Sequence, residues 1–369
     1  MIKFVFFLLM GNLALAQTVS TFLDDPAVDV DDGLVFDNDG NLYGSNFAGD
    51  TVYQISPAGV ATPFVSGFTN PNGLAFDTNG DFFVVDWGAG EVVKFDNGGN
   101  LLETYNVGPT PSGLIATPTG TVIYTDTNDD SIKEIATDGT ITTLFTGTPL
   151  NAPVGLAYDE NDVLYVGNFV GREVYRFTGS DMEYVATVPD GGAATNNFLG
   201  FIAYADGNLY GTNFGGHQIY KINPEAVDDV TLFSGGDQGS ADGDISVATF
   251  SFPNGIIYNP SQDALYVSEF SGVGNIRRID GILSIGENEI SLDAFIAPNP
   301  VGDRLNFSLP NDRSAIHSVS IYTISGALVT VHTDLSTNSI DVAHLVQGMY
   351  FAEIASVENK TSVQAFIKN

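Results

Sequence analysis

One phrase, built around a single glycine, recurs six times between residues 32 and 258 of this chain. Its clearest copy opens residues 71–95, which read PNGLAFDTNGDFFVVDWGAGEVVKF: a short apolar stretch, a turn and two further strand-like stretches. Successive glycines lie 40, 40, 42, 45 and 55 residues apart. They are Gly33, Gly73, Gly113, Gly155, Gly200 and Gly255. This periodicity predicts a series of similar β units.

A repeating unit of about 40–45 residues with four strands is typical of the blades of a β-propeller. Six copies therefore predict an all-β fold with a six-bladed β-propeller over residues 17–281. The sixth copy ends near Arg278 and has no further strand after it. Residues 18–23 precede the first copy and resemble residues 60–65. We expect residues 18–23 to form the outer strand of the last blade, because an unpaired strand edge is a template for aggregation.

The sixth copy carries a family resemblance. Residues 238–279 contain, in order, an Asp-Gly pair at 242–243, an aromatic opening with proline and glycine at 250–255, the strand-like stretch 265–267 and the ending NIRRI at 275–279. This order resembles an NHL repeat. The resemblance extends to all six copies and implies an open-faced, six-bladed propeller related to the gluconolactonase-like superfamily.

The first residues predict export. Lys3 provides a short basic start, residues 4–10 are apolar, and residues 14–16 read ALA, a small-x-small cleavage site before Gln17. This order is typical of a secretory signal peptide, which we expect at residues 1–16. The apolar run is too short to cross a bilayer, and we expect no transmembrane segment. The chain has no cysteine, which excludes disulfides and thiolate metal sites.

The pattern changes after a polar linker at residues 282–294. Residues 295–369 contain short strand-like stretches separated by turn signals, which predict a small Ig-like β-sandwich. The phrases at 297–309, 319–329 and 340–354, followed by the final FIKN, resemble the C-terminal sorting domain of the type IX secretion system of Bacteroidota. The resemblance implies that the type IX machinery is a partner of this domain. It also implies passage across the outer membrane, with release or attachment at the cell surface.

The charge of the chain limits its partners. Twelve Lys and Arg residues stand against 45 Asp and Glu residues, which gives a formal net charge of −33. Such a surface repels nucleic acid and anionic lipid, so we expect no nucleic-acid partner. The charge favours solubility in a salty exterior. The alternative is a surface that binds cations, above all Ca²⁺, through its many oxygen atoms.

The first candidate site is the mouth of the central channel. The residue before each repeated glycine is expected to point toward the axis. These residues are Asp32, Asn72, Ser112, Val154, Leu199 and Asn254. The sixth, first and second blades are neighbours in a closed ring, so Asp32, Asn72 and Asn254 are predicted to cluster. One carboxylate and two amide oxygens could share a Ca²⁺ ion that water completes. The alternative is that these groups are structural polar residues of the channel.

The gluconolactonase-like resemblance implies a catalytic divalent metal at such positions, held by a glutamate of the first blade and by Asn and Asp of later blades. Asp32 takes the place of that glutamate. The later positions are occupied here by Val154 and Leu199, which are apolar. The metal set of the family is therefore incomplete, which argues against the lactonase mechanism.

A second set of polar residues lies thirteen residues after each glycine, or fourteen in the last copy. The set is Asn46, Asp86, Asp126, Asn168, Asn213 and Glu269. An aromatic residue follows in five copies: Phe47, Trp87, Phe169, Phe214 and Phe270. One interpretation is structural, with the polar side chains binding turn backbone and the aromatic rings packing between blades. The other is a rim that stacks a sugar or a peptide, with Trp87 as the best single candidate.

Two hypotheses for function remain open. The first is a non-catalytic binding module for an extracellular protein, peptide or glycan. The second is a divalent-metal-dependent lactonase or hydrolase. His217 is the only histidine in residues 17–281, which argues against histidine catalysis, and no phosphate-binding or dinucleotide fingerprint is present. The apolar residues at the channel mouth favour the binding module.

Overall fold

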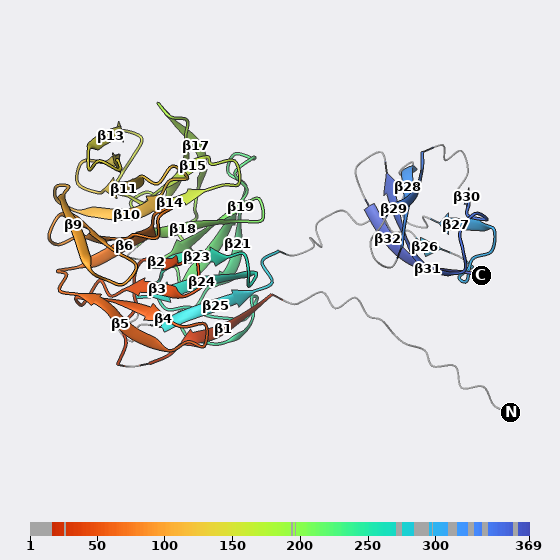
Figure 1. Ribbon diagram of the computed structural model, residues 1–369, viewed down its shortest axis with the longest axis horizontal. Helices are drawn as coiled ribbons and strands as arrows, with labels where there is room; N and C mark the ends of the chain where they lie inside the picture. The colour runs from red at the N-terminus through yellow and green to blue at the C-terminus, as the bar shows by residue number, and fades with distance from the viewer. Residues whose placement is uncertain are drawn as a thin grey trace. The chain divides into compact units, whose positions relative to one another are not determined.

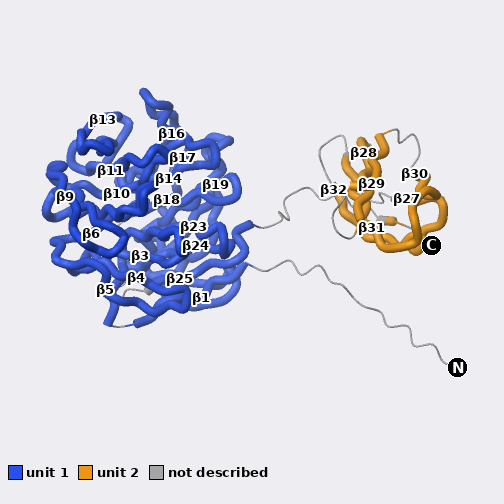
Figure 2. Tube along the Cα trace, viewed as in Figure 1, with its two compact units in different colours: residues 1–283 blue, residues 284–369 orange. Residues whose placement is uncertain are grey.

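The computed structural model describes residues 17–25, 27–192, 195, 197–270, 275–283, 295–296, 298–308, 316–323, 328–333, 339–356 and 361–369. The chain divides into two compact units, residues 1–283 and 284–369 (Figure 2). The predicted signal peptide and residues 284–294 of the predicted linker lie outside the described residues. Every regular element in the described part is a β-strand, so no helix there could span a membrane.

The described residues of the first unit form six antiparallel sheets (Figure 1). Five of them have four strands each, paired in chain order. Their strands are β2 (Leu34–Phe36), β3 (Leu42–Ser45), β4 (Thr51–Ile55) and β5 (Ala61–Ser66); β6 (Pro71–Phe76), β7 (Phe82–Asp86), β8 (Glu91–Phe95) and β9 (Leu101–Asn106); β10 (Pro111–Ala116), β11 (Val122–Asp126), β12 (Ser131–Ile135) and β13 (Ile141–Thr146); β14 (Pro153–Tyr158), β15 (Leu164–Asn168), β16 (Glu173–Phe177) and β17 (Met182–Thr187); and β18 (Leu199–Ala205), β19 (Asn208–Asn213), β20 (Gln218–Ile222) and β21 (Val230–Gly235). Sheets of this kind are typical of a β-propeller.

The sixth sheet joins the two ends of the first unit. Its strands are β22 (Gly243–Asp244), β1 (Thr18–Leu23), β25 (Asn275–Asp280), β24 (Ala264–Glu269) and β23 (Pro253–Asn259), in that spatial order. β1 runs antiparallel to β25, with Val19 opposite Ile279. The N-terminal strand therefore lies in the same sheet as the last repeat.

The first strands of the sheets contact one another in sequence. β2 contacts β6, β6 contacts β10, β10 contacts β14, β14 contacts β18, β18 contacts β23, and β23 contacts β2. The repeated glycines make this approach possible, because a β-carbon at Gly73 would overlap the carbonyl oxygen of Ser112. A β-carbon at Gly255 would likewise overlap the carbonyl oxygen of Asp32. Only glycine fits where backbones come this close.

The fifth copy of the repeat is offset by one residue from the sequence prediction. In the first sheet Leu34 is paired with Gly44, and in the fifth sheet Ile202 is paired with Gly211 at the equivalent place. Phe201 therefore occupies the position of Gly33.

The prediction that Leu199 points toward the axis is consequently wrong. Leu199 is fully buried, and its side chain packs against Gly167 and Gly211. Phe201, two residues later, borders the cavity in its place.

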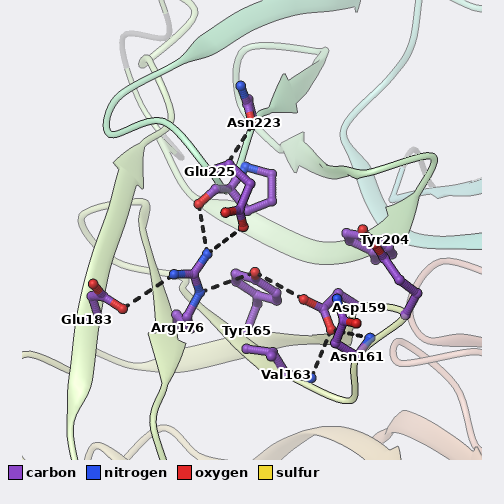
Figure 3. Close-up of polar contacts among 11 residues, drawn as sticks. Asp159, Asn161, Val163, Tyr165, Arg176, Glu183, Tyr204, Asn223 and Glu225 are labelled. Carbon is purple, nitrogen blue, oxygen red and sulfur yellow. Dashed lines mark hydrogen bonds and ion pairs between the residues drawn. The ribbon is translucent and has the colours of Figure 1, made fainter.

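A polar network links the fourth sheet (β14 to β17) with the fifth sheet (β18 to β21). The Arg176 guanidinium in β16 donates to the Tyr165 hydroxyl in β15 at 3.3 Å (Figure 3). It also donates to the Pro224 carbonyl at 3.0 Å and pairs with Glu225 at 2.9 Å, both in the loop after β20. This network is structural, because the contacts of Arg176 with Pro224 and Glu225 fix its sheet against the next one.

The second unit contains two sheets in its described residues. One has the order β26 (Phe295–Ile296), β27 (Arg304–Ser308) and β30 (Ser339–Asp341); the other has the order β29 (Leu328–His332), β28 (Ile316–Thr323), β31 (Gly348–Ser356) and β32 (Thr361–Lys368). Buried residues alternate along the strands, as with Leu305 and Phe307 or Val319 and Ile321. They form one cluster, so both sheets bury a face in a common core.

Candidate functional site

A cavity of about 370 Å³ lies where the first strands of the six sheets begin and the second strands end. Its lining residues are Asp32, Phe47, Asn72, Trp87, Ser112, Thr127, Ala152, Val154, Phe169, Phe201, Phe214, Asn254 and Phe270. All four sequence-predicted site residues are among them: Asp32, Asn72, Asn254 and Trp87. These residues meet because they occupy equivalent positions of the repeat, and each sheet brings that position to the same cavity.

The polar residues of the cavity come from the starts of the first strands. Asn72 and Asn254 lie in β6 and β23. Asp32 lies two residues before the start of β2. Asp32 is 4% exposed, Asn72 6% and Asn254 7%. Within the described part of the chain, the Oδ1 atoms of Asp32 and Asn72 have no hydrogen-bond partner. Buried acceptors without a donor are costly and mark a place where a ligand can supply one.

Burial dominates the electrostatics of the acidic pair at this position. Desolvation, and secondarily the charge of Asp31, raises the pKa of Asp32 well above its ordinary value. Desolvation also raises the pKa of Asp31 to about 7, although its carboxylate accepts the Phe47 N–H at 2.7 Å. Burial thus disfavours the charged form of Asp32, and a cation beside it would favour that form.

Apart from Phe201, which lies in β18, the aromatic residues of the cavity follow the second strands of their sheets. The rings of Phe47 and Trp87 have centroids 5.7 Å apart, and those of Phe47 and Phe270 are 6.3 Å apart. Phe214 lies 5.7 Å from Phe270, and Phe169 stacks on Phe198 outside this series at 4.2 Å. The aromatic set thus forms a collar, defined here as Phe47, Trp87, Phe169, Phe214 and Phe270, which borders the cavity in addition to contacting neighbouring rings.

The second set of polar residues holds backbone loops. The Asp86 carboxylate accepts the N–H groups of Thr69, Asn70 and Ala89 at 2.8, 3.0 and 3.2 Å. Asn168 accepts the Asn151 N–H at 3.0 Å. These contacts match the structural interpretation of this set, because the side chains fix the loops before β6 and β14 and the turn after β7.

His217 also has a local role. Its Nδ1 accepts the Phe252 N–H at 3.1 Å, and the two rings meet edge to face at 4.5 Å. Burial lowers its pKa, which favours the neutral imidazole. The histidine therefore orders the loop before β23.

The residues around the cavity fit a calcium ion only in part. Asp32, Asn72 and Asn254 supply oxygen atoms, which is the chemistry that Ca²⁺ prefers. Two of the three have an unpartnered Oδ1. Val154 and Phe201 supply no donor, and the described residues contain no group of three or more acidic or histidine side chains that could hold a metal. The donor set suits a weak site that depends on water.

Phe201, Thr127 and Ala152 line the cavity and were missed by the sequence interpretation, and Phe201 is the largest of them. Its signal was present in the alternation of Ile202, Ala203 and Tyr204, which matches that of Leu74, Ala75 and Phe76. Phe201 thereby aligns with Gly73. Aligning apolar strands rather than glycines would have found the offset.

A family model described as a secretion system C-terminal sorting domain matches residues 295–369. This domain marks the chain for export by the type IX system, to the cell surface or the medium. No curated protein matches the chain.

Solved structures share the fold of the first unit. An auxiliary nutrient binding protein from Bacteroides thetaiotaomicron is 16% identical with a TM-score of 0.58, over 71% of this chain and 76% of that one. A gluconolactonase from Xanthomonas campestris is 17% identical with a TM-score of 0.56, over 73% and 92%. A streptogramin B lyase is 14% identical with a TM-score of 0.53, over 73% and 99%. At these identities the likeness concerns the propeller fold alone.

Proposed function

We propose that the chain is an exported binding protein whose cavity holds an extracellular protein, peptide or glycan ligand without chemical turnover. In this proposal a signal peptide at residues 1–16 precedes a six-bladed NHL-type propeller at 17–281. A linker at 282–294 leads to an Ig-like sorting domain at 295–369. Contact between β2 and β23 supports a closed ring of six blades, and the shared core of the two C-terminal sheets supports the sandwich.

The aromatic collar is the observation that carries the proposal. Five rings border one cavity, although each comes from a different sheet. Aromatic faces stack on sugar rings and on apolar or aromatic peptide side chains, and they lose little conformational entropy on binding. A cavity of about 370 Å³ is within the range of ligand sites.

The polar groups of the cavity favour binding over acid–base catalysis. Among the described residues that line it, Asp32 is the only ionisable one. Asp86, in the second polar set, is committed to three backbone N–H groups. Hydrolysis by general acid and general base needs a second positioned group, which the lining residues do not supply.

The proposal is tested with glycan and peptide arrays probed with the full chain and with Trp87→Ala. We expect at least one array ligand whose signal falls by about tenfold or more in the variant, because a stacked aromatic anchor contributes about 1–3 kcal/mol. Leu101→Ala is the matched control, since Leu101 is 63% exposed and lies away from the cavity lining. Equal signals for all three chains on every ligand would refute the proposed site.

A divalent-metal-dependent lactonase is the second candidate, favoured by the unpartnered oxygens of Asp32 and Asn72. Asp32, Asn72 and Asn254 would hold the ion, and a bound Ca²⁺ would polarise a lactone carbonyl. A thermal melt in excess EDTA and then in Ca²⁺ tests it. A site at a hundredfold over its dissociation constant adds about 2.7 kcal/mol, and Asp32→Ala should abolish the shift. An unchanged melt of the native chain eliminates this candidate.

A further inference from the structure

We infer that the cavity recognises a protonated amine: a small organic ammonium group with an apolar body, free or as part of a larger ligand. The inference rests on the proposed function and names the chemistry of its ligand. The apolar body lies against the collar, and the N–H groups of the ammonium donate to the buried oxygens of Asp32 and Asn72.

The hydrogen-bonding capacity of the cavity calls for a donor. Asp32 and Asn72 each present an Oδ1 atom that is buried and has no partner among the described residues. An ammonium group carries donors and no acceptor, which is the hydrogen-bonding capacity that such atoms lack. A ligand with only acceptors, such as a carboxylate or a phosphate, would leave them unpaired.

The charge of the cavity also favours a cationic ligand. Asp32 lines it, whereas its lining residues include no Lys, Arg or His. The sequence as a whole has a formal net charge of −33, which attracts cations and repels anions over long distances. A cation beside Asp32 stabilises the carboxylate, and each partner compensates the burial of the other.

The collar suits a cation as well as an apolar body. The faces of Trp, Tyr and Phe rings attract a cation within about 6 Å through their quadrupole. Phe47, Trp87 and Phe270 form a continuous series of rings on one side of the cavity. A quaternary ammonium would share this attraction but would offer no N–H, so a primary or secondary amine fits the oxygens better.

Trp87 provides a direct test, because it is the only tryptophan in the chain. Its emission is followed while the full chain is titrated, at physiological ionic strength, with 2-phenylethylammonium, 2-phenylethanol or phenylacetate. The three probes share an aromatic body and differ in their polar group. We expect the ammonium to bind at least about tenfold more tightly than the alcohol, and the carboxylate most weakly, as a charged hydrogen bond predicts.

Asp32→Asn keeps the shape of the side chain and removes its charge, so it should reduce ammonium affinity by about tenfold or more. Asp39→Asn is the matched control, because Asp39 is an exposed acid of the first sheet and lies outside the cavity lining. The control should bind as the native chain does. The comparison among the three probes uses the native chain, so it holds even if a variant fails to fold.

Equal affinity for ammonium and alcohol, an equal loss in both variants, or no response to any probe would overturn the inference. The proposed function is judged separately by the arrays. An array ligand that depends on Trp87 but carries no amine would leave the binding function standing while this inference falls. If no array ligand depends on Trp87, the proposed function itself is refuted.

Discussion

At the residue scale, Asp32 is the polar group on which the proposed ligand recognition depends. A carboxyl group that is 4% exposed and lacks a hydrogen-bond partner at Oδ1 among the described residues costs stability in the folded chain. Such a cost is typical of a functional site, where the binding partner supplies the missing interaction. Nearby Asp31 shares the burial, but its carboxylate is held by the Phe47 N–H. The two adjacent acids therefore have different roles.

The stability of the chain should depend on pH through Asp32. Its pKa is raised in the folded chain from an ordinary value of 3.8, so the folded chain keeps a proton that the unfolded chain releases. Stability is then highest at low pH and is lost as the pH rises from 3.8 toward the raised pKa. Asp32→Asn cannot release this proton, so its free energy of unfolding should fall less as the pH rises and should exceed that of the native chain at pH values above the raised pKa.

Urea unfolding at a series of pH values measures this difference. Asp31 keeps its own raised pKa in the variant, so a smaller decline with pH should remain. Asp39→Asn, which changes an exposed acid, should follow the native curve. If the free energies of unfolding of Asp32→Asn and of the native chain changed equally with pH, the raised pKa of Asp32 would be contradicted.

At the element scale, the repeated strands were predictable and their exact alignment was not. Strand periodicity and turn residues are local properties, so the phrase around Gly73 predicts strands, and the structure has β6, β7 and β8 there. The register of the fifth copy depends on pairing between strands, which places Ile202 opposite Gly211. Gly200 lies one position before the place that the other repeated glycines occupy, so the glycine spacing does not give the register of this copy.

The convergence of the collar on one cavity could not be predicted from the sequence. The recurrence of an aromatic residue after each second strand is visible in the sequence, and both a structural and a binding interpretation are compatible with it. Only the three-dimensional arrangement brings Phe47 and Trp87 to the border of the same cavity as Asp32. Whether repeated residues converge on a site depends on how the sheets close, which a single repeat does not contain.

At the scale of the whole molecule, two units have separate tasks. The sorting domain at residues 295–369 directs export, and its sequence pattern was specific enough to be found without a structure. The propeller unit carries the cavity, and its fold is shared with proteins of different printed activities, including a nutrient binding protein and a gluconolactonase. Fold alone therefore does not assign the function, which depends on the residues of the site.

The most direct test of the binding account is acrylamide quenching of Trp87 emission in the full chain, with and without a saturating array ligand. Trp87 is the sole tryptophan and lines the cavity, so the quenching reports access to this site alone. We predict that the bound ligand lowers the quenching constant, because it covers the indole ring. A quenching constant that stays the same at saturation would place binding elsewhere and contradict the account.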